Sequence, residues 1–441
     1  MSRGELHFDA VVIGAGSAGL TAATRLAEGG ARVCVLAKGN GSTHLAPGTV
    51  DVLGYAPDVV EEPARALSEL VAARPDHPYA LMGVESVAPA LQWFAQCMAD
   101  GPQPGYRYVG DLEHNHLLPT AVGVLRPSAL VPETMAEGDM RRREAVCIVG
   151  SPALRDFHAA LCAANLEAAG IAARSVDVDL EVERADANAL GLARRFDDPG
   201  FRAAFAAQLT PLLHGDERVG LPAVLGLRDP HGAWADLQRR LGRGVFEIPT
   251  LPPSVPGIRA YEALRAALRA AGGRLVLGSA VTGADRDGAR VTAVATNAAG
   301  HDVHYHARWF VLASGGFASG GIALGSDWVT RETALGLPLR GLPDGGEPRF
   351  VGDYLAEQPM ARVGVAVDGS LRAEGTENVL VAGATLPGAV PWREGSGEGI
   401  ALASGHRAAE VALAEGANVG GLERPEADRS LQDAGLDAPR R

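Results

Sequence analysis

Cysteine is scarce in this chain of 441 residues. There are four, Cys34, Cys97, Cys147 and Cys162, and they are scattered without a C-x-x-C pair. This pattern excludes a disulfide-stapled scaffold and argues against a cysteine-ligated iron–sulfur cluster within the chain. It is typical of a reducing compartment, so we expect a cytoplasmic protein.

Positive charge and long apolar runs are also in short supply. Lysine and arginine number 40 against 53 aspartates and glutamates, and the net charge is −13. A nucleic-acid partner needs a basic surface, so the composition argues against one. The uncharged stretch Trp309–Ser326 is interrupted by five glycines and predicts a strand and a loop. We therefore expect no direct membrane insertion and, since a strand begins so early in the sequence, we also expect no signal peptide.

Glycine, in contrast, is abundant, and three glycines form the most informative motif. An apolar, β-prone run, Ala10–Ile13, leads directly into Gly14, Gly16 and Gly19, which have G-x-G-x-x-G spacing. In this motif the first glycine permits the tight strand-to-helix turn, and the second lets the backbone approach a pyrophosphate. The third lets helix and strand pack closely. The motif therefore predicts a phosphate-binding turn.

A strand–helix–strand unit surrounds this turn. The helix predicted from Ser17 onward presents its first N–H groups and the positive end of its dipole to the phosphates, so Ser17 and Ala18 join the predicted binding turn. A second strand, Arg32–Leu36, completes the unit. At its end an acidic residue usually binds the adenosine ribose, but this chain has Ala37 followed by Lys38. The unit predicts dinucleotide binding with an altered contact at the adenosine end.

The C-terminal half predicts the remainder of the same sheet. A helix over Ala260–Ala271 precedes a strand at Arg274–Leu277, a two-stranded meander and a wholly apolar strand, Trp309–Ala313. The meander strands are Val291–Thr296 and Val303–Ala307. A last buried strand, Asn378–Ala382, precedes a helix from about Gly399 to Gly416. We therefore predict an α/β protein: a Rossmann-like domain with a parallel central sheet and a β-meander, interrupted by an inserted α/β domain.

A change of character after residue 60 predicts the domain boundaries. Residues 61–253 show helical patterns and occasional strands without a glycine fingerprint, and the proline-rich segment 249–257 marks a crossing between domains. We assign residues 1–60 and 254–420 to the nucleotide-binding domain. Residues 61–253 form the inserted domain, which would meet a substrate or a partner. Residues 421–441 are polar and predict a disordered tail.

Three separated segments resemble one known class of flavoprotein. They are the opening fingerprint, the strand that runs into Ala313–Gly316, and the closing segments Asn378–Gly383 and Gly395–Ile400. In this order they resemble the flavin domain of two-dinucleotide-binding-domain flavoproteins, most closely the fumarate reductase and succinate dehydrogenase type. The resemblance implies that the last helix start faces the pyrimidine edge of the flavin. Beyond the fingerprint, Ala37 and Lys38, the flavin-binding positions that it implies are Ala313, Ser314, Gly315, Gly383, Gly397, Gly399 and Ile400.

Further segments narrow the resemblance. They are His77–Tyr79, Gly150-Ser151 with Asp156–His158, Leu251–Arg259 and Ala313–Gly321. With the fingerprint they resemble the family of the B subunit of anaerobic glycerol-3-phosphate dehydrogenase over nearly the whole chain. The resemblance implies a flavoprotein subunit of a complex that oxidises glycerol 3-phosphate to dihydroxyacetone phosphate. It also implies a companion catalytic flavoprotein subunit and an iron–sulfur, membrane-anchoring subunit that carry electrons to membrane quinone. These would hold the chain peripherally at the inner face of the cell membrane.

Two arguments bear on the identity of the flavin. The fingerprint favours a diphosphate, hence FAD, but Ala37 removes the usual contact to the adenosine ribose. The family that the chain resembles implies FMN, whose single phosphate could lie at the same helix start. We therefore predict FMN, with FAD as the close alternative.

Three side chains are candidates for the chemistry. Oxidation of a secondary alcohol needs a base for the hydroxyl proton, and a phosphorylated substrate needs cations. His44 lies in a polar loop that by resemblance runs over the flavin, so it is either the base or an ordinary loop residue. Arg259 and Arg393 lie in predicted loops near the flavin and are candidate phosphate clamps. His114 and His116 lack a third ligand, so we predict a solvated loop there and no metal site.

Three functions stay open at this point. The first is the subunit of a glycerol-3-phosphate dehydrogenase complex. The second is a stand-alone flavin-dependent oxidoreductase of the fumarate reductase type. The third is a non-catalytic flavoprotein scaffold or electron relay, because the substrate site could lie in the companion subunit. Reduction of a bound flavin by glycerol 3-phosphate, with and without partners, distinguishes them.

Overall fold

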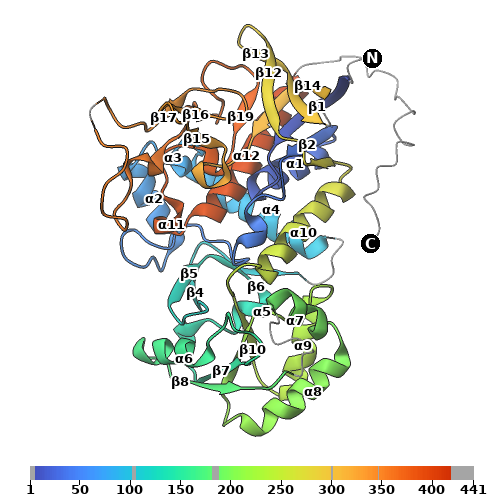
Figure 1. Cartoon of the computed structure of the whole chain (residues 1–441), viewed down its shortest axis with the longest axis vertical. Coiled ribbons are helices and arrows are strands. Elements are labelled where there is room, and N and C mark those ends of the chain that lie inside the picture. The colour runs from blue at the N-terminus through green and yellow to red at the C-terminus, as the bar shows by residue number, and fades with distance from the viewer. Residues whose placement is uncertain (1–4, 102–105, 181–187, 299–300, 346, 419–441) are drawn as a thin grey trace.

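The structure is a computed structural model that describes residues 5–101, 106–180, 188–298, 301–345 and 347–418. Figure 1 shows the blue N-terminal and red C-terminal segments together in its upper part, and the green middle of the chain in its lower part. The tail expected over residues 421–441 lies outside the described residues.

A seven-stranded sheet forms the centre of the upper part. Its order is β11-β2-β1-β14-β13-β12, and β19 pairs with the end of β14. The strands β11, β2, β1, β14 and β19 are parallel, and β12, β13 and β14 form an antiparallel meander. The predicted parallel sheet with a β-meander is thus confirmed. The strands are β1 Glu5–Ile13, β2 Val33–Ala37, β11 Arg274–Leu277, β12 Val281–Asp287, β13 Arg290–Ala298, β14 His301–Leu312 and β19 Val379–Val381.

Strand β14 differs from its prediction. The sequence predicted two strands, Val303–Ala307 and Trp309–Ala313, but the structure has one continuous strand. Strand β1 pairs with it in parallel register from Glu5 opposite His304 to Ile13 opposite Leu312. Because β1 pairs with β14 on both sides of Arg308, the two apolar runs join in one strand that continues through this residue. Its end therefore lies beside the end of β1.

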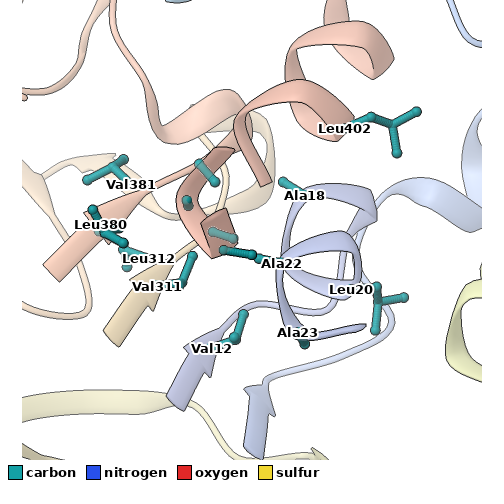
Figure 2. Close-up of a cluster of buried hydrophobic side chains, with 14 of the residues drawn as sticks. Val12, Ala18, Leu20, Ala22, Ala23, Val311, Leu312, Leu380, Val381 and Leu402 are labelled. Carbon is teal, nitrogen blue, oxygen red and sulfur yellow. The ribbon is translucent and has the colours of Figure 1, made fainter. Parts of the chain in front are cut away.

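Helix α1 packs on the sheet together with α12. Figure 2 shows Ala18 and Ala22 of α1 in one buried cluster with Leu312 of β14 and Leu402 of α12. Small residues allow this close approach, since a Cβ at Gly405 of α12 would lie 2.3 Å from the carbonyl oxygen of Ala18. The helices of this part are α1 Ser17–Glu28, α2 Pro63–Ala73, α3 Pro78–Met82, α4 Val87–Asp100, α10 Val255–Ala270, α11 Pro391–Glu394 and α12 Gly397–Asn418.

A second α/β body forms the lower part of Figure 1. Its sheet has the order β10-β9-β7-β8, and its strands are parallel. Its hydrophobic core is separate from that of the first sheet and runs from Met140 to Val255. Its elements are β7 Val146–Gly150, α6 Ala159–Ala168, β8 Ala173–Asp177, α7 Ala189–Phe196, α8 Pro199–Leu209, β9 Arg218–Pro222, α9 Pro230–Leu241 and β10 Val245–Ile248.

The division between the two cores does not coincide with the expected boundary at residue 61. Leu67 of α2, Tyr79 of α3 and Phe94 of α4 are buried in the first core, and α4 packs on α12. These helices therefore belong by packing to the first body, because α3 and α4 pack on α12 and α2 packs on α3. Short elements connect the bodies or lie at the edge of the first: β3 Tyr108–Gly110, β4 His116–Pro119, β5 Leu125–Ser128, β6 Leu130–Pro132, α5 Glu133–Ala136, β15 Ile322–Leu324, β16 Thr330–Glu332, β17 Leu339–Arg340 and β18 Gly364–Val365.

Candidate active site

One large cavity opens at the carboxyl ends of the central parallel strands. Its volume is about 870 Å³, within the usual range of roughly 300–1,000 Å³ for ligand sites. It is lined by the turns after β1, β2 and β14, by the starts of α1 and α12, and by the short 3-10 helix η1 (Thr43–Leu45). Open α/β sheets bind ligands at this edge, so the cavity is the candidate active site.

The glycine fingerprint forms the first wall of the cavity. Gly14 has a φ of +114°, and a Cβ there would lie 2.2 Å from the carbonyl oxygen of Ala313 at the end of β14. A Cβ at Gly19 would lie 2.0 Å from the carbonyl oxygen of Gly14. A Cβ at Gly16, in contrast, would meet only Thr43 Oγ1, at 4.0 Å. Glycine is therefore required at positions 14 and 19, because any side chain there would collide with the backbone. Gly16, in contrast, leaves open space beside the first N–H groups of α1.

The end of β2 forms the second wall. The carbonyl of Ala37 accepts a hydrogen bond of 3.0 Å from the backbone N–H of Ser279, which brings the turn after β11 into the same wall. Lys38 is exposed beside it. Among the described residues, the carboxylates that line the cavity are Asp51 and Glu398, and neither belongs to this wall. The sequence departure at Ala37 is therefore not compensated by another acidic side chain there.

The turns after β14 and β19 form the third wall. Gly315 has a φ of +82° and donates its N–H to Thr385 Oγ1 at 3.0 Å. Ser314 Oγ is buried and finds no hydrogen-bond partner in the part of the chain that the structure describes. The predicted positions that line the cavity are Gly14, Gly16, Ser17, Ala18, Ala37, Lys38, His44, Ala313, Ser314, Gly315, Gly383, Gly397 and Ile400.

Two glycines from the prediction lie behind the cavity wall. Gly19 packs against the turn, as described above, and Gly399 packs against other elements. A Cβ at Gly399 would lie 2.5 Å from the hydroxyl of Tyr79 and 2.8 Å from Cα of Val52. Helix α12 begins at Gly397, two residues before the predicted start, so Glu398 lies in its first turn and faces the cavity instead.

His44 lies in η1 and is half-buried against the cavity. Its Nδ1 is buried and has no hydrogen-bond partner among the described residues. The neighbouring Thr43 Oγ1 lies 2.9 Å from Ser17 Oγ, which ties η1 to the start of α1. Buried polar atoms are rarely left unpaired, so Nδ1 of His44 and Oγ of Ser314 fit a polar ligand in this cavity. A flavin nucleotide, with its phosphates at the open space beside Gly16, meets these requirements.

The two predicted arginines lie elsewhere. Arg259 is not in a loop but in α10, and its side chain is 1% exposed. Its Nη1 lies 2.6 Å from Oε2 of Glu247, and it also donates to the carbonyl of Gly226. Arg393 is in α11 and exposed, and it donates to the carbonyl of Leu355. Neither lines the cavity, so the geometry does not favour the phosphate-clamp role expected for them.

Arg259 is expected to act through stability. Arg259→Met leaves Glu247 buried without its cation, which typically costs about 3–5 kcal/mol of unfolding free energy. Urea unfolding measures this loss, and the flavin content per folded molecule should stay unchanged. Adding Glu247→Gln removes the unpaired charge, keeps one acceptor oxygen for the N–H of Leu225 and places an amide N–H that can donate to the hydroxyl oxygen of Thr134, so it should restore part of the stability. Loss of flavin from the folded single variant would contradict this assignment.

An ion pair that no sequence pattern indicated lines the cavity near α12. Nε of Arg126, on β5, donates to Oδ2 of the buried Asp51 at 2.7 Å. Asp51 also accepts hydrogen bonds from Ser128 Oγ at 2.6 Å and Thr49 Oγ1 at 2.9 Å. The two partners are separated by 75 positions in the chain. No local pattern connects them, and only the fold brings them to one wall.

Glu398 was also missed, although it lies inside the predicted Gly397–Ile400 motif. Burial, together with the charge of Asp51, raises the pKa of Glu398 to about 7, while an interaction with the Ser17 hydroxyl opposes this shift. A carboxyl group with a pKa near neutrality in a cavity is suited to exchange protons during catalysis. The sequence did contain a signal for it: Glu398 is an acidic residue between Gly397 and Ile400, two positions predicted to bind the flavin.

A buried network fixes the start of α12. Glu394, at the end of α11, accepts hydrogen bonds from Arg74 Nη1 at 2.9 Å, His77 Nε2 at 3.2 Å and Ser396 Oγ at 2.9 Å. Burial alone would raise the pKa of Glu394, but the hydrogen bonds from His77 and Arg74 outweigh it and lower the pKa to about 2. The network therefore holds an ionised carboxylate that links α2 and α3 to the turn before α12.

The fold and the cavity define a flavin-binding protein, and comparison with known families agrees. A family model described as the FAD binding domain matches residues 9–400. A protein from Pectobacterium carotovorum subsp. carotovorum (strain PC1), named as the B subunit of anaerobic glycerol-3-phosphate dehydrogenase, is 34% identical over 93% of this chain and 100% of that protein. A protein from Halobacterium salinarum (strain ATCC 29341 / DSM 671 / R1), named as the probable B subunit of the same enzyme, is 34% identical over 92% of this chain and 98% of that protein. The chain belongs to this anaerobic glycerol-3-phosphate dehydrogenase B subunit family, within the FAD-binding family.

Solved structures resemble the chain more distantly. E. coli quinol fumarate reductase FrdA is 10% identical with a TM-score of 0.46, and the match covers 95% of this chain and 72% of that one. Mycobacterium smegmatis Sdh1 in complex with UQ1 is 12% identical with a TM-score of 0.44, and the match covers 95% of this chain and 70% of that one. Both scores are below 0.5, so the family assignment comes from the sequence matches.

Two further features concern membranes and metals. Among the residues with described positions, we find no helix with the length and apolar character needed to span a bilayer. Within the same residues, His, Cys, Asp and Glu side chains do not gather in groups of three that could hold a metal ion. The solvated loop predicted for His116 is wrong: this residue begins β4, and its Nδ1 lies 3.1 Å from Oδ2 of Asp139.

Proposed function

We propose that the bound flavin is FAD. The expectation of FMN came from the resemblance to the B subunit family, and it has no support in the matched family model, which is described as an FAD binding domain. The cavity continues from the start of α1 past Ala37 and Lys38 to Ser279, where an adenosine would lie. FMN bound by its phosphate at α1 would leave this arm of the cavity without a ligand, so the extent of the cavity supports the dinucleotide.

We propose that the chain is the flavoprotein subunit of a complex that oxidises glycerol 3-phosphate to dihydroxyacetone phosphate. The observation that carries this proposal is the match, over nearly the full length, to relatives that bear the name of a subunit of that enzyme. The cavity agrees with it, because the turns after β1, β2 and β14 and the start of α12 all line it. A bound flavin supplies the acceptor for the hydride that leaves the carbinol carbon. The electrons would continue through a companion flavoprotein and an iron–sulfur subunit to membrane quinone, with this chain held at the inner face of the cell membrane.

The part of the cavity near α12 offers the groups that such a substrate needs. Arg126 is the arginine that lines the cavity among the described residues, and a guanidinium can bind a phosphate bidentately. His44 has an unpaired Nδ1 and Glu398 has a near-neutral pKa, so either could take the hydroxyl proton. In this proposal Arg126 positions the phosphate, and His44 is the first choice for the base.

One observation favours a second function, an electron relay. Arg126 already pairs with the buried Asp51, so its charge is partly neutralised before any substrate phosphate arrives. A relay needs the flavin cavity but no phosphate clamp, and the substrate would then bind to the companion subunit.

A visible spectrum of the purified chain, recorded without oxygen, tests the proposal. We expect flavin absorbance, a released cofactor with the mass of FAD, and loss of the oxidised flavin band on addition of glycerol 3-phosphate. Arg126→Gln should raise the concentration of glycerol 3-phosphate that reduces half of the flavin by about tenfold or more, equivalent to at least about 1.4 kcal/mol of binding free energy. The matched control is Arg331→Gln, which breaks an exposed ion pair with Asp327 and removes no group that lines the cavity.

The other outcomes are equally informative. Reduction that requires an added partner subunit would support the relay function and contradict substrate binding in this chain. A purified, folded chain without flavin would contradict both functions. An FMN mass would overturn the choice of FAD.

A further inference from the structure

Glu398 occupies a singular position between two helix starts. It lies in the first turn of α12 and lines the main cavity together with Ser17 at the start of α1. It also borders a second, small cavity of about 10 Å³, whose wall includes Tyr108 and Thr43. That volume is close to the minimum that holds one water molecule. The carboxyl group is therefore open to the ligand cavity and close to a place for water.

Glu398 is half-buried at the cavity wall and lacks the cation that carboxylates inside a protein normally have. Among the described residues it forms no ion pair, and the polar group that it meets is the Ser17 hydroxyl. Glu394, four positions earlier, provides the contrast, because Arg74 and His77 hold it ionised. Two neighbouring carboxyl groups thus have opposite environments, and only Glu398 has a near-neutral pKa, caused by burial and by Asp51.

Asp51, Arg126 and Tyr108, which lie around Glu398, already have partners. Asp51 pairs with Arg126 of β5. The hydroxyl of Tyr108 donates to the carbonyl of Gly48 at 2.7 Å, and burial raises its pKa well above the ordinary value. His44 of η1 lines the cavity as a second titratable group and serves the substrate in the proposed function. Glu398 is therefore the acid without an ion-pair partner, and its protonation can respond to a change of charge in the cavity.

We propose that Glu398 is a proton-exchanging residue that compensates the charge of the flavin. Above about pH 7 its carboxylate is ionised beside the oxidised cofactor, takes up one proton from solvent when two electrons arrive from the substrate, and releases that proton when the electrons leave. The physical reason is Coulomb repulsion, since negative charge that arrives in the same low-dielectric cavity favours the neutral acid. This inference rests on the proposed flavin binding.

The pH dependence of the flavin midpoint potential tests the inference in the full-length holoprotein. One additional proton per two electrons changes the reduction equilibrium tenfold per pH unit, or about 30 mV. We expect Glu398→Gln to lose this part of the slope around pH 7. The reduced-minus-oxidised infrared spectrum should contain a protonated-carboxyl band in the unmodified protein that is missing in Glu398→Gln. Glu410→Gln is the control, because Glu410 lies in the same helix, is 40% exposed and pairs with Arg25.

The possible failures can be told apart. Equal slopes in the unmodified protein and Glu398→Gln, with flavin bound to both, would overturn the inference and leave the proposed function intact. A carboxyl band that persists in Glu398→Gln would assign the proton to another residue and overturn it as well. A protein that binds no flavin would contradict the proposed function itself. If Glu398→Gln does not retain flavin, the infrared band of the unmodified protein alone decides, and its absence overturns the inference.

Discussion

Gly16→Ala is expected to leave the protein folded and to lower its affinity for flavin by about tenfold or more, equivalent to at least about 1.4 kcal/mol. Gly16 has an extended backbone with φ −79° and ψ −178°, which alanine adopts without strain. An added Cβ would meet no protein atom closer than 4.0 Å. It would, however, occupy the space beside the first N–H groups of α1 where the phosphates must approach. Titration of the apoprotein with FAD measures the change.

Two other glycines give the matched comparisons for this experiment. Gly14→Ala should prevent stable folding, because alanine there has an unfavourable φ of +114° and a Cβ that would collide with the carbonyl of Ala313. Gly283→Ala, in β12, should change neither property, since its Cβ would meet nothing within 4 Å. Unchanged flavin affinity in folded Gly16→Ala would show that the phosphates are not held at this turn.

Glu394→Gln is expected to lower the unfolding free energy by about 3 kcal/mol at pH 7. The pKa of Glu394 falls from 4.5 to about 2 on folding, and each unit corresponds to about 1.4 kcal/mol. Removal of one partner from a buried ion pair gives a similar figure of about 3–5 kcal/mol. Because the network holds Ser396 and the start of α12, the variant should also bind flavin more weakly. Urea unfolding measures the stability change.

The pH dependence of this loss follows from the direction of the shift. A carboxyl group whose pKa is lower in the folded state stabilises the protein above its unfolded pKa, and loses this contribution as pH falls through its folded pKa. The difference between the unmodified protein and Glu394→Gln should therefore be full above about pH 5 and shrink between pH 4.5 and 2. Glu374→Gln, which breaks an exposed pair with Arg340, should cost less than about 1 kcal/mol. A pH-independent difference would show that the charge of Glu394 is not the stabilising feature.

The sequence predicted the central sheet and its phosphate turn because these depend on short-range patterns. Gly14, Gly16 and Gly19 follow an apolar strand directly, and the spacing itself encodes the turn. Ala37 could be placed at the end of β2 for the same reason. In β14 the local pattern was misleading, since pairing with β1 on both sides of Arg308 joins the two apolar runs in one strand.

The arginines show the limit of such local patterns. Arg259 follows a proline-rich segment and was expected in a loop, but the N-cap of Ser254 and the fixed φ of Pro256 begin a helix there. Its partner, Glu247, lies on β10 of the second body. Whether an arginine forms a structural ion pair or binds a phosphate depends on the groups that the fold places around it. For Arg393, the turn before α12 directs the side chain to Leu355 and away from the cavity.

By itself, the sequence determined the class of fold, the flavin-binding turn, the missing acidic contact at Ala37 and the family. Only the tertiary structure decided which charges face the flavin cavity. Asp51 and Arg126 meet across 75 positions, and Glu394 meets Arg74 across 320, whereas Glu398 meets no cation among the described residues. The physical reason is that a side chain's charge depends on burial and on partners that are distant in sequence, and neither is encoded in a local pattern.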